Sequence, residues 1–146
     1  MNDNLDTFLD NLQEEIFDDA KEAFGEAGFE RWRNPKYNGR MENFDTSACI
    51  KGECGDTMEM FLKFDGNCVK CASYITDGCA SSTICGSITA EMSIGKDPDE
   101  LTEITGDAVL KKIDRFPEED RHCAFLASET LQEALRCYMM NGSKKK

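Results

Sequence analysis

The sequence predicts an α+β fold, in which a small three-stranded antiparallel sheet carries helices on one face and a long helix comes first. Three observations lead to this prediction. Apolar residues recur at spacings of three and four near the N-terminus, alternate with polar residues between positions 46 and 76, and return to a spacing of four after Gly78. Because strands come first and helices follow, a sheet covered by helices is favoured over alternating strand–helix units.

The first segment is expected to form an amphipathic helix from about Asn4 to Phe24, with Gly25 and Gly28 as suitable ends. Its apolar stripe consists of Leu5, Phe8, Leu9, Leu12, Ile16, Phe17, Ala20 and Phe24. Such a stripe packs on something, and the sequence leaves open whether that is its own domain or another subunit.

Three short strands are expected at 46–51, 57–64 and 69–76, and the last two are joined by a turn at Asp65-Gly66-Asn67 as a hairpin. Alternation in the second strand places four apolar side chains on one face, and Phe61 is the exception on the polar face. The four are Met58, Met60, Leu62 and Phe64.

Helices are expected after the sheet. The first follows Gly78 and ends near Gly95, two short ones follow (the first capped by Asp97-Pro98), and a long one runs from about Asp120 to Met140.

The whole chain divides into an N-terminal helix with a linker (1–33), a main domain (34–140) and a disordered tail (141–146).

Composition excludes several classes of function. The 146 residues fit one domain, and the net charge of -12 argues against nucleic acid, whose phosphates require a basic surface. No apolar run is long enough for a membrane span, and the acidic start differs from a secretion signal. We therefore expect a cytoplasmic protein that makes no membrane contact and prefers partners with basic patches.

Eight cysteines are the most informative feature of the composition. In a reducing compartment they are metal ligands, reactive thiols or buried small side chains more often than disulfides. Cys54, Cys79 and Cys123 stand at expected element boundaries, where sites usually form. Cys79 and Cys123 also fall at expected helix N-termini, whose unpaired N–H groups stabilise a thiolate.

Two neighbouring residues offer a fourth ligand that is not sulfur. Asp56 lies two residues after Cys54, and His122, the single histidine, precedes Cys123. Thiolates combined with carboxylate or imidazole suit either an iron–sulfur cluster or tetrahedral zinc, and spacing alone does not choose between them. Gly55 and Gly78 are expected to let the backbone approach a bulky ligand.

Several stretches resemble the U-type iron–sulfur cluster scaffolds, the IscU-like proteins and the N-terminal domain of NifU-like proteins. The matching stretches follow the family's order and are NPKYNGRM (34–41), ECGDTMEMFLKF (53–64), DGCASST (77–83), GKDPDELTEIT (95–105) and HCAFLASETLQEAL (122–135). Each motif alone is weak, whereas CGD, GC before a helix and HC opening the last helix together are specific.

The resemblance implies a scaffold, not a turnover catalyst, on which a transient [2Fe–2S] cluster is assembled and passed to apo iron–sulfur proteins. It implies a cysteine desulfurase as sulfur donor, with Cys54, Cys79 and Cys123 as cluster ligands and sulfur acceptors. Asp56 corresponds to the aspartate that keeps the cluster labile, and His122 to the histidine beside the last cysteine. We expect a monomer or a weak homo-oligomer, and zinc as a possible occupant of the same site in purified protein.

One departure from the family concerns its Leu-Pro-Pro-Val-Lys segment, which an Hsp70-type chaperone reads. Here the corresponding stretch is RFPEEDRHC, with Asp120 in place of the lysine. This departure argues against chaperone-driven transfer.

Two alternatives use the same cysteines differently. A zinc-bound sulfur acceptor that partners a desulfurase would use the same three, although that branch of the family carries an insertion for which the step from Cys79 to Cys123 looks too short. A structural zinc module would use Cys49, Cys54, Cys68 and Cys71.

The remaining cysteines are not expected to be ligands of the main site. Cys68 and Cys71 form a single CxxC whose odd separation predicts opposite faces of a strand. Cys85 and Cys137 are expected in the core, and Cys49 is the most plausible auxiliary thiol.

Overall fold

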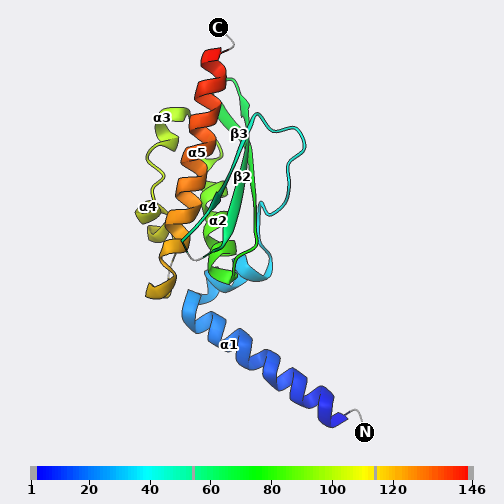
Figure 1. Ribbon diagram of the computed structural model, residues 1–146. Helices are drawn as coiled ribbons and strands as arrows, with labels where there is room; N and C mark the ends of the chain where they lie inside the picture. Colours follow the sequence, from blue (N-terminus) through cyan, green and yellow to red (C-terminus); the bar gives the residue numbers. More distant parts are fainter. Residues whose placement is uncertain (1–2, 54, 114, 145–146) are drawn as a thin grey trace.

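The computed structural model describes residues 3–53, 55–113 and 115–144. A three-stranded antiparallel sheet in the order β1-β2-β3 is covered on one face by the long helices α2 and α5 (Figure 1). The elements are α1 (Asp3–Arg33), β1 (Thr46–Lys51), β2 (Thr57–Asp65), β3 (Cys68–Thr76), α2 (Ala80–Ser93), α3 (Pro98–Leu101), α4 (Gly106–Lys111), the 3-10 turn η1 (Glu118–Asp120) and α5 (His122–Lys144). The predicted fold class is confirmed.

The core lies between the sheet and helices α2 and α5. Alternation in β2 directs Met58, Met60 and Leu62 into it, and all three are fully buried. From β3, Tyr74 inserts its ring fully and donates a hydrogen bond from its hydroxyl to the Thr83 carbonyl of α2 (2.8 Å). This bond satisfies the one polar atom of a large buried side chain, as burial in a core requires.

Phe61 is fully buried on the other face of the sheet, although its position in the alternation predicted a polar face. The loop 34–45 covers it. The Phe44 ring contacts the Phe61 ring at a tilt, with 5.4 Å between their centroids, and the Arg40 guanidinium lies 5.5 Å from the centroid of the Phe61 ring. The loop is held against β3, because the Gly39 N–H donates to the Tyr74 carbonyl (2.8 Å). Part of this face is therefore a small second core.

The first of the two helices that make up α1 ends at Gly25, as predicted, and a second helix that was not predicted follows it. Gly25 has non-helical angles (φ 77°, ψ 174°), and the helix resumes after it as far as Arg33. A glycine tolerates this left-handed φ, so the chain bends at this position and the second part packs back beside the first. Phe17 contacts Phe29 (5.5 Å between centroids), and the earlier part of α1 leads away from the domain (Figure 1).

The prediction that Cys68 and Cys71 occupy opposite faces of β3 is wrong. The pairing with β2 shifts between Lys63, which faces Cys71, and Phe64, which faces Val69. A bulge inserts one residue and so offsets the odd separation, which leaves both cysteines exposed.

The other cysteines largely match expectation. Cys85 is buried, Cys137 is half-buried and Cys49 is exposed.

Helix α5 begins at His122 and continues to Lys144, past the expected end at Met140. The expected disordered tail is therefore helical over 141–144. No proline interrupts these positions, so the backbone hydrogen bonds of the helix continue. None of the helices in the described ranges is long and apolar enough to cross a membrane.

Candidate metal centre

Three segments that are distant in sequence meet at one end of the molecule, the lower end of the domain in Figure 1. They are the turn between β1 and β2, the start of α2 and the start of α5. A carboxylate oxygen of Asp56 and the sulfurs of Cys79 and Cys123 all lie within 4.8 Å of one another. In the described part of the chain, no other group of three or more such side chains is close enough to hold a metal ion.

Burial differs among these three side chains. Cys123 is buried, Asp56 is half-buried and Cys79 is exposed. The site is thus anchored in the core on one side and open to solvent on the other, which suits a ligand that must enter and leave.

The turn that carries Asp56 is held by its own backbone. The Gly52 N–H donates to the Asp56 carbonyl (2.7 Å), and the Gly55 N–H donates to the Gly52 carbonyl (3.0 Å). Gly55 has a positive φ of 95°, and a Cβ there would meet nothing within 4 Å. Gly55 therefore supplies backbone conformation and not space.

Gly78 permits a close approach between two protein segments, whereas the expected approach to a bulky ligand stays a prediction for both glycines. A Cβ at this position would lie 2.5 Å from Ser82 Oγ and 2.8 Å from Asp56 Oδ2. Only a residue without a side chain lets the start of α2 and the Asp56 turn come this close.

Both cysteines stand at helix starts, as predicted. Cys79 is the N-cap of α2, with extended backbone, and its carbonyl accepts from the Thr83 N–H (3.1 Å). Cys123 is the second residue of α5. The N-termini of two helices, with their partial positive charges, thus lie beside the side chains that would be anionic ligands.

Ser82 is a member of the site that sequence reasoning missed. Its fully buried hydroxyl lies 3.3 Å from Asp56 Oδ2 and 3.4 Å from Cys123 Sγ. One hydroxyl has one proton, so Ser82 donates to one of these two ligands at a time. Its position three residues after Cys79 in DGCASST, one helical turn on, was the available signal.

Two further residues of α2, Ser81 and Cys85, lie near the candidate site. The Ser81 hydroxyl donates to Asp120 Oδ2 (2.7 Å) and so ties α2 to the segment that leads into α5. Cys85 is buried deeper along α2. Burial, and then the charges of Cys123, Cys79 and Asp120, raise the pKa of the Cys85 thiol well above its ordinary value. Cys85 therefore stays protonated and serves as packing.

Two predicted ligands are not in this group. Cys54 lies outside the described residues. His122 is exposed at the first position of α5, and it is not among the side chains whose donor atoms lie within 4.8 Å. Their assignment as ligands stays a prediction.

Asp77 orders the approach to Cys79 and gives a testable pH dependence. Its Oδ1 accepts a hydrogen bond from the Thr57 N–H (2.7 Å), which lowers the pKa of the Asp77 carboxyl. A lowered pKa in the folded state means that this stabilisation is present above the unfolded-state value and is lost as pH falls through the folded one. Urea denaturation should show Asp77→Asn to be less stable than wild type at pH 7, with the difference shrinking as pH falls below the ordinary pKa of an aspartate, about 3.9. A difference that stays the same as pH falls would contradict this role.

Comparison with known proteins identifies the family of this chain. Residues 24–145 match the family described as the NifU-like N terminal domain, which is most of the chain. The chain belongs to this family. The predicted resemblance is confirmed, and the NifU-like match begins at Phe24, just before the bend at Gly25.

Curated relatives of this NifU-like chain carry consistent names. The iron–sulfur cluster assembly scaffold proteins IscU 1 and IscU 2 of Archaeoglobus fulgidus are each 31% identical over 117 residues, which is 80% of this chain and 76% of theirs. The iron–sulfur cluster assembly protein IscU of Plasmodium falciparum is 26% identical and covers 92% of this chain and 80% of its own.

Solved structures show the same fold. The N-terminal NifU-like protein from Brucella abortus superimposes with a TM-score of 0.62 at 21% identity, over 79% of this chain and 93% of that one. The structure titled "Putative iron-sulfur cluster assembly scaffold protein for SUF system", from Fervidobacterium islandicum, gives the same TM-score and identity, over 80% of this chain and 98% of that one.

Proposed function

We propose that this chain is a scaffold on which a transient [2Fe–2S] cluster is assembled from iron and desulfurase-derived sulfur and then passed to apo iron–sulfur proteins. The convergence of two cysteine sulfurs and a carboxylate within 4.8 Å, open on one side, carries this proposal. Scaffold names among the relatives support it.

The proposed roles follow from ligand chemistry. Cys79 and Cys123, together with Cys54, bind iron and sulfide as thiolates, which are the preferred ligands of such clusters. Asp56 adds a hard oxygen ligand that binds iron less firmly than a further thiolate would, so the assembled cluster can be released. His122, next to Cys123, is proposed as a further ligand from the exposed edge.

The open side of the site also fits the proposed partners. Exposed Cys79 is accessible to a cysteine desulfurase that delivers sulfur and to an apoprotein that takes the cluster. Buried Cys123 anchors the cluster at the protein side. The proposed scaffold thus exchanges cargo through one face and is not itself a turnover catalyst.

Anaerobic reconstitution tests the proposal. Apoprotein is mixed with ferrous iron, cysteine, a cysteine desulfurase and a thiol reductant, which supplies the electrons that reduce persulfide sulfur to sulfide. The product is followed by visible absorption and Mössbauer spectroscopy. The expected result is a coloured protein with the spectrum of a [2Fe–2S] cluster, which apo-ferredoxin then removes. A protein that remains colourless and binds no sulfide would overturn the proposal.

Cysteine variants locate the cluster. Cys79→Ser and Cys123→Ser should each reduce the visible absorbance of the reconstituted protein by about tenfold, because loss of one thiolate weakens the metal site strongly. Cys68→Ser is the matched control, since Cys68 is exposed on β3 outside the candidate site. Equal loss in all three variants would place the cluster elsewhere.

Zinc is the alternative occupant, because two thiolates and a carboxylate also suit Zn²⁺. A zinc-bound sulfur acceptor would bind one Zn²⁺ per chain, stay colourless and take up desulfurase sulfur on Cys79 or Cys123 without retaining iron. Metal analysis beside the visible spectrum separates this function from the scaffold.

A further inference from the structure

The part of α1 before its bend carries an apolar stripe that nothing in the described structure covers. We call residues 3–16 the N-terminal rod. Five large apolar side chains of the rod are 42% to 62% exposed, namely Leu5, Phe8, Leu9, Leu12 and Ile16. At spacings of three and four they form one face of the helix, and such contiguous apolar surfaces mark binding sites.

Aromatic contacts hold the base of the rod. Phe17 packs against Phe29 and Trp32, with centroid distances of 5.5 and 6.4 Å. The Arg33 guanidinium lies 4.4 Å from the Phe17 ring. Phe24 is buried and meets Phe116 at 5.8 Å. These contacts join the two parts of α1 around the bend and direct the rod outward (Figure 1).

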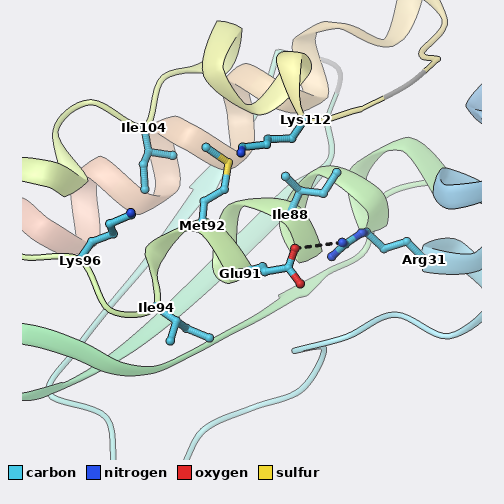
Figure 2. Close-up of a pocket in the computed structure, with 8 residues that line it drawn as sticks. All are labelled: Arg31, Ile88, Glu91, Met92, Ile94, Lys96, Ile104 and Lys112. Carbon is cyan, nitrogen blue, oxygen red and sulfur yellow. Dashed lines mark hydrogen bonds and ion pairs between the residues drawn. The ribbon is translucent and has the colours of Figure 1, made fainter.

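A pocket of about 390 Å³ lies between α2 and the segments around α3 and α4, away from the metal centre. Figure 2 shows its apolar floor, formed by Ile88, Met92 and Ile104, with Lys96 and Lys112 extending toward each other across it. A pocket of this size accepts a few apolar side chains and not a whole helix.

The pocket carries an excess of positive charge. At its edge, Arg31 is paired with Glu91 (3.0 Å). Among the described residues, no ion pair involves Lys96 or Lys112. The pocket therefore presents two uncompensated positive charges beside an apolar floor, within a protein of net charge -12. We call it the lysine pocket.

The N-terminal rod has the opposite charge. The rod carries no lysine or arginine and five acidic residues, which are Asp3, Asp6, Asp10, Glu14 and Glu15. Two rods placed stripe against stripe would bring these acidic flanks together, and their like charges would repel. A rod placed against the lysine pocket matches both its charge and its apolar face.

We propose that the occupant is a second copy of this chain, so that the rod of each copy docks in the lysine pocket of the other. Reciprocal docking about a twofold axis uses both stripes and both pockets and forms a closed dimer. The dimer leaves the metal centre out of the contact and does not depend on a bound cluster, so it stands apart from the proposed function.

Sedimentation velocity of the full apo chain over a concentration series tests the proposal. Wild type should show a reversible monomer–dimer equilibrium that weakens as salt is raised, because the charged contacts are near the surface. Lys96→Glu with Lys112→Glu should raise the dissociation constant by at least about tenfold, and so should Leu9→Ser in the rod. Lys51→Glu with Lys70→Glu, two exposed lysines on the sheet, is the matched control and should leave the constant unchanged.

Charge exchange identifies the contact directly. Asp6 and Glu15 border the stripe on its two sides. Adding Asp6→Lys and Glu15→Lys to the Lys96→Glu, Lys112→Glu variant should restore the dimer, and circular dichroism verifies that each variant is folded. A wild type that stays monomeric at all concentrations overturns the proposal, and so does a pocket variant that dimerises like the control.

Discussion

Asp56→Ala should make a reconstituted cluster resist a chelator about tenfold longer than wild type. In the structure the Asp56 carboxylate lies beside the sulfurs of Cys79 and Cys123, and the Ser82 hydroxyl is 3.3 Å from it. The carboxylate can therefore leave the iron and still keep a hydrogen-bond partner, which gives a chelator or an acceptor thiolate a place to attack. Alanine removes this exchangeable ligand and leaves the thiolates to hold the cluster.

The decay of visible absorbance in the presence of a chelator measures the effect. Asp120→Ala is the matched control, because Asp120 is a carboxylate at the same end of the molecule that pairs with Ser81 and is not in the metal-binding group. The control should decay like wild type. Faster loss of iron from Asp56→Ala would show that Asp56 retains the cluster and does not promote its release.

Gly86→Ala should lower the free energy of unfolding by about 2 kcal/mol, which corresponds to a fall in Tm of about 4–8 °C. A Cβ at Gly86 would lie 2.5 and 2.7 Å from two ring atoms of Tyr74. That ring is fully buried and its hydroxyl is bonded to Thr83, so it has no room to retreat. The gain of about 1 kcal/mol from alanine in a helix is smaller than this steric cost.

Gly106→Ala provides the comparison for thermal denaturation. Its Cβ would also meet an aromatic ring, that of Phe125, but this ring is 40% exposed and can rotate into solvent. The free energy of unfolding of Gly106→Ala should stay within about 0.5 kcal/mol of the wild-type value. If the two variants proved equally stable, the tight contact between α2 and Tyr74 would not be a determinant of stability.

Most of the fold was predictable because local patterns and tertiary packing agree. The alternation of Met58, Met60 and Leu62 and the Asp65-Gly66-Asn67 turn specify the hairpin whatever packs on it. Phe61 was the informative exception. Its burial depends on a loop that carries no regular pattern of its own, and only the folded chain brings Phe44 and Arg40 over its ring.

The candidate site was predictable as a set of residue types but not as a geometry. Cysteines at helix starts and an aspartate in a turn can be recognised from spacing, whereas distances between remote segments cannot. Ser82 was missed because its spacing of three from Cys79, the one available signal, does not by itself distinguish a site residue from ordinary helix packing. The bulge that turns Cys68 and Cys71 to the same side depends on how β3 pairs with β2, and this pairing register cannot be predicted from the neighbouring residues alone.

The remote origin of the site residues has a thermodynamic consequence. Asp56, Cys79 and Cys123 come from separate segments, so they lie close enough to bind one metal ion only when the sheet and both long helices are assembled. An unfolded chain lacks this arrangement, and linkage then requires that the proposed cargo, once bound, stabilise the native state, by about 2.7 kcal/mol at a hundredfold excess over the dissociation constant. Release of that cargo would return the protein to its less stable form, so the melting temperature of the chain would report how fully it is loaded.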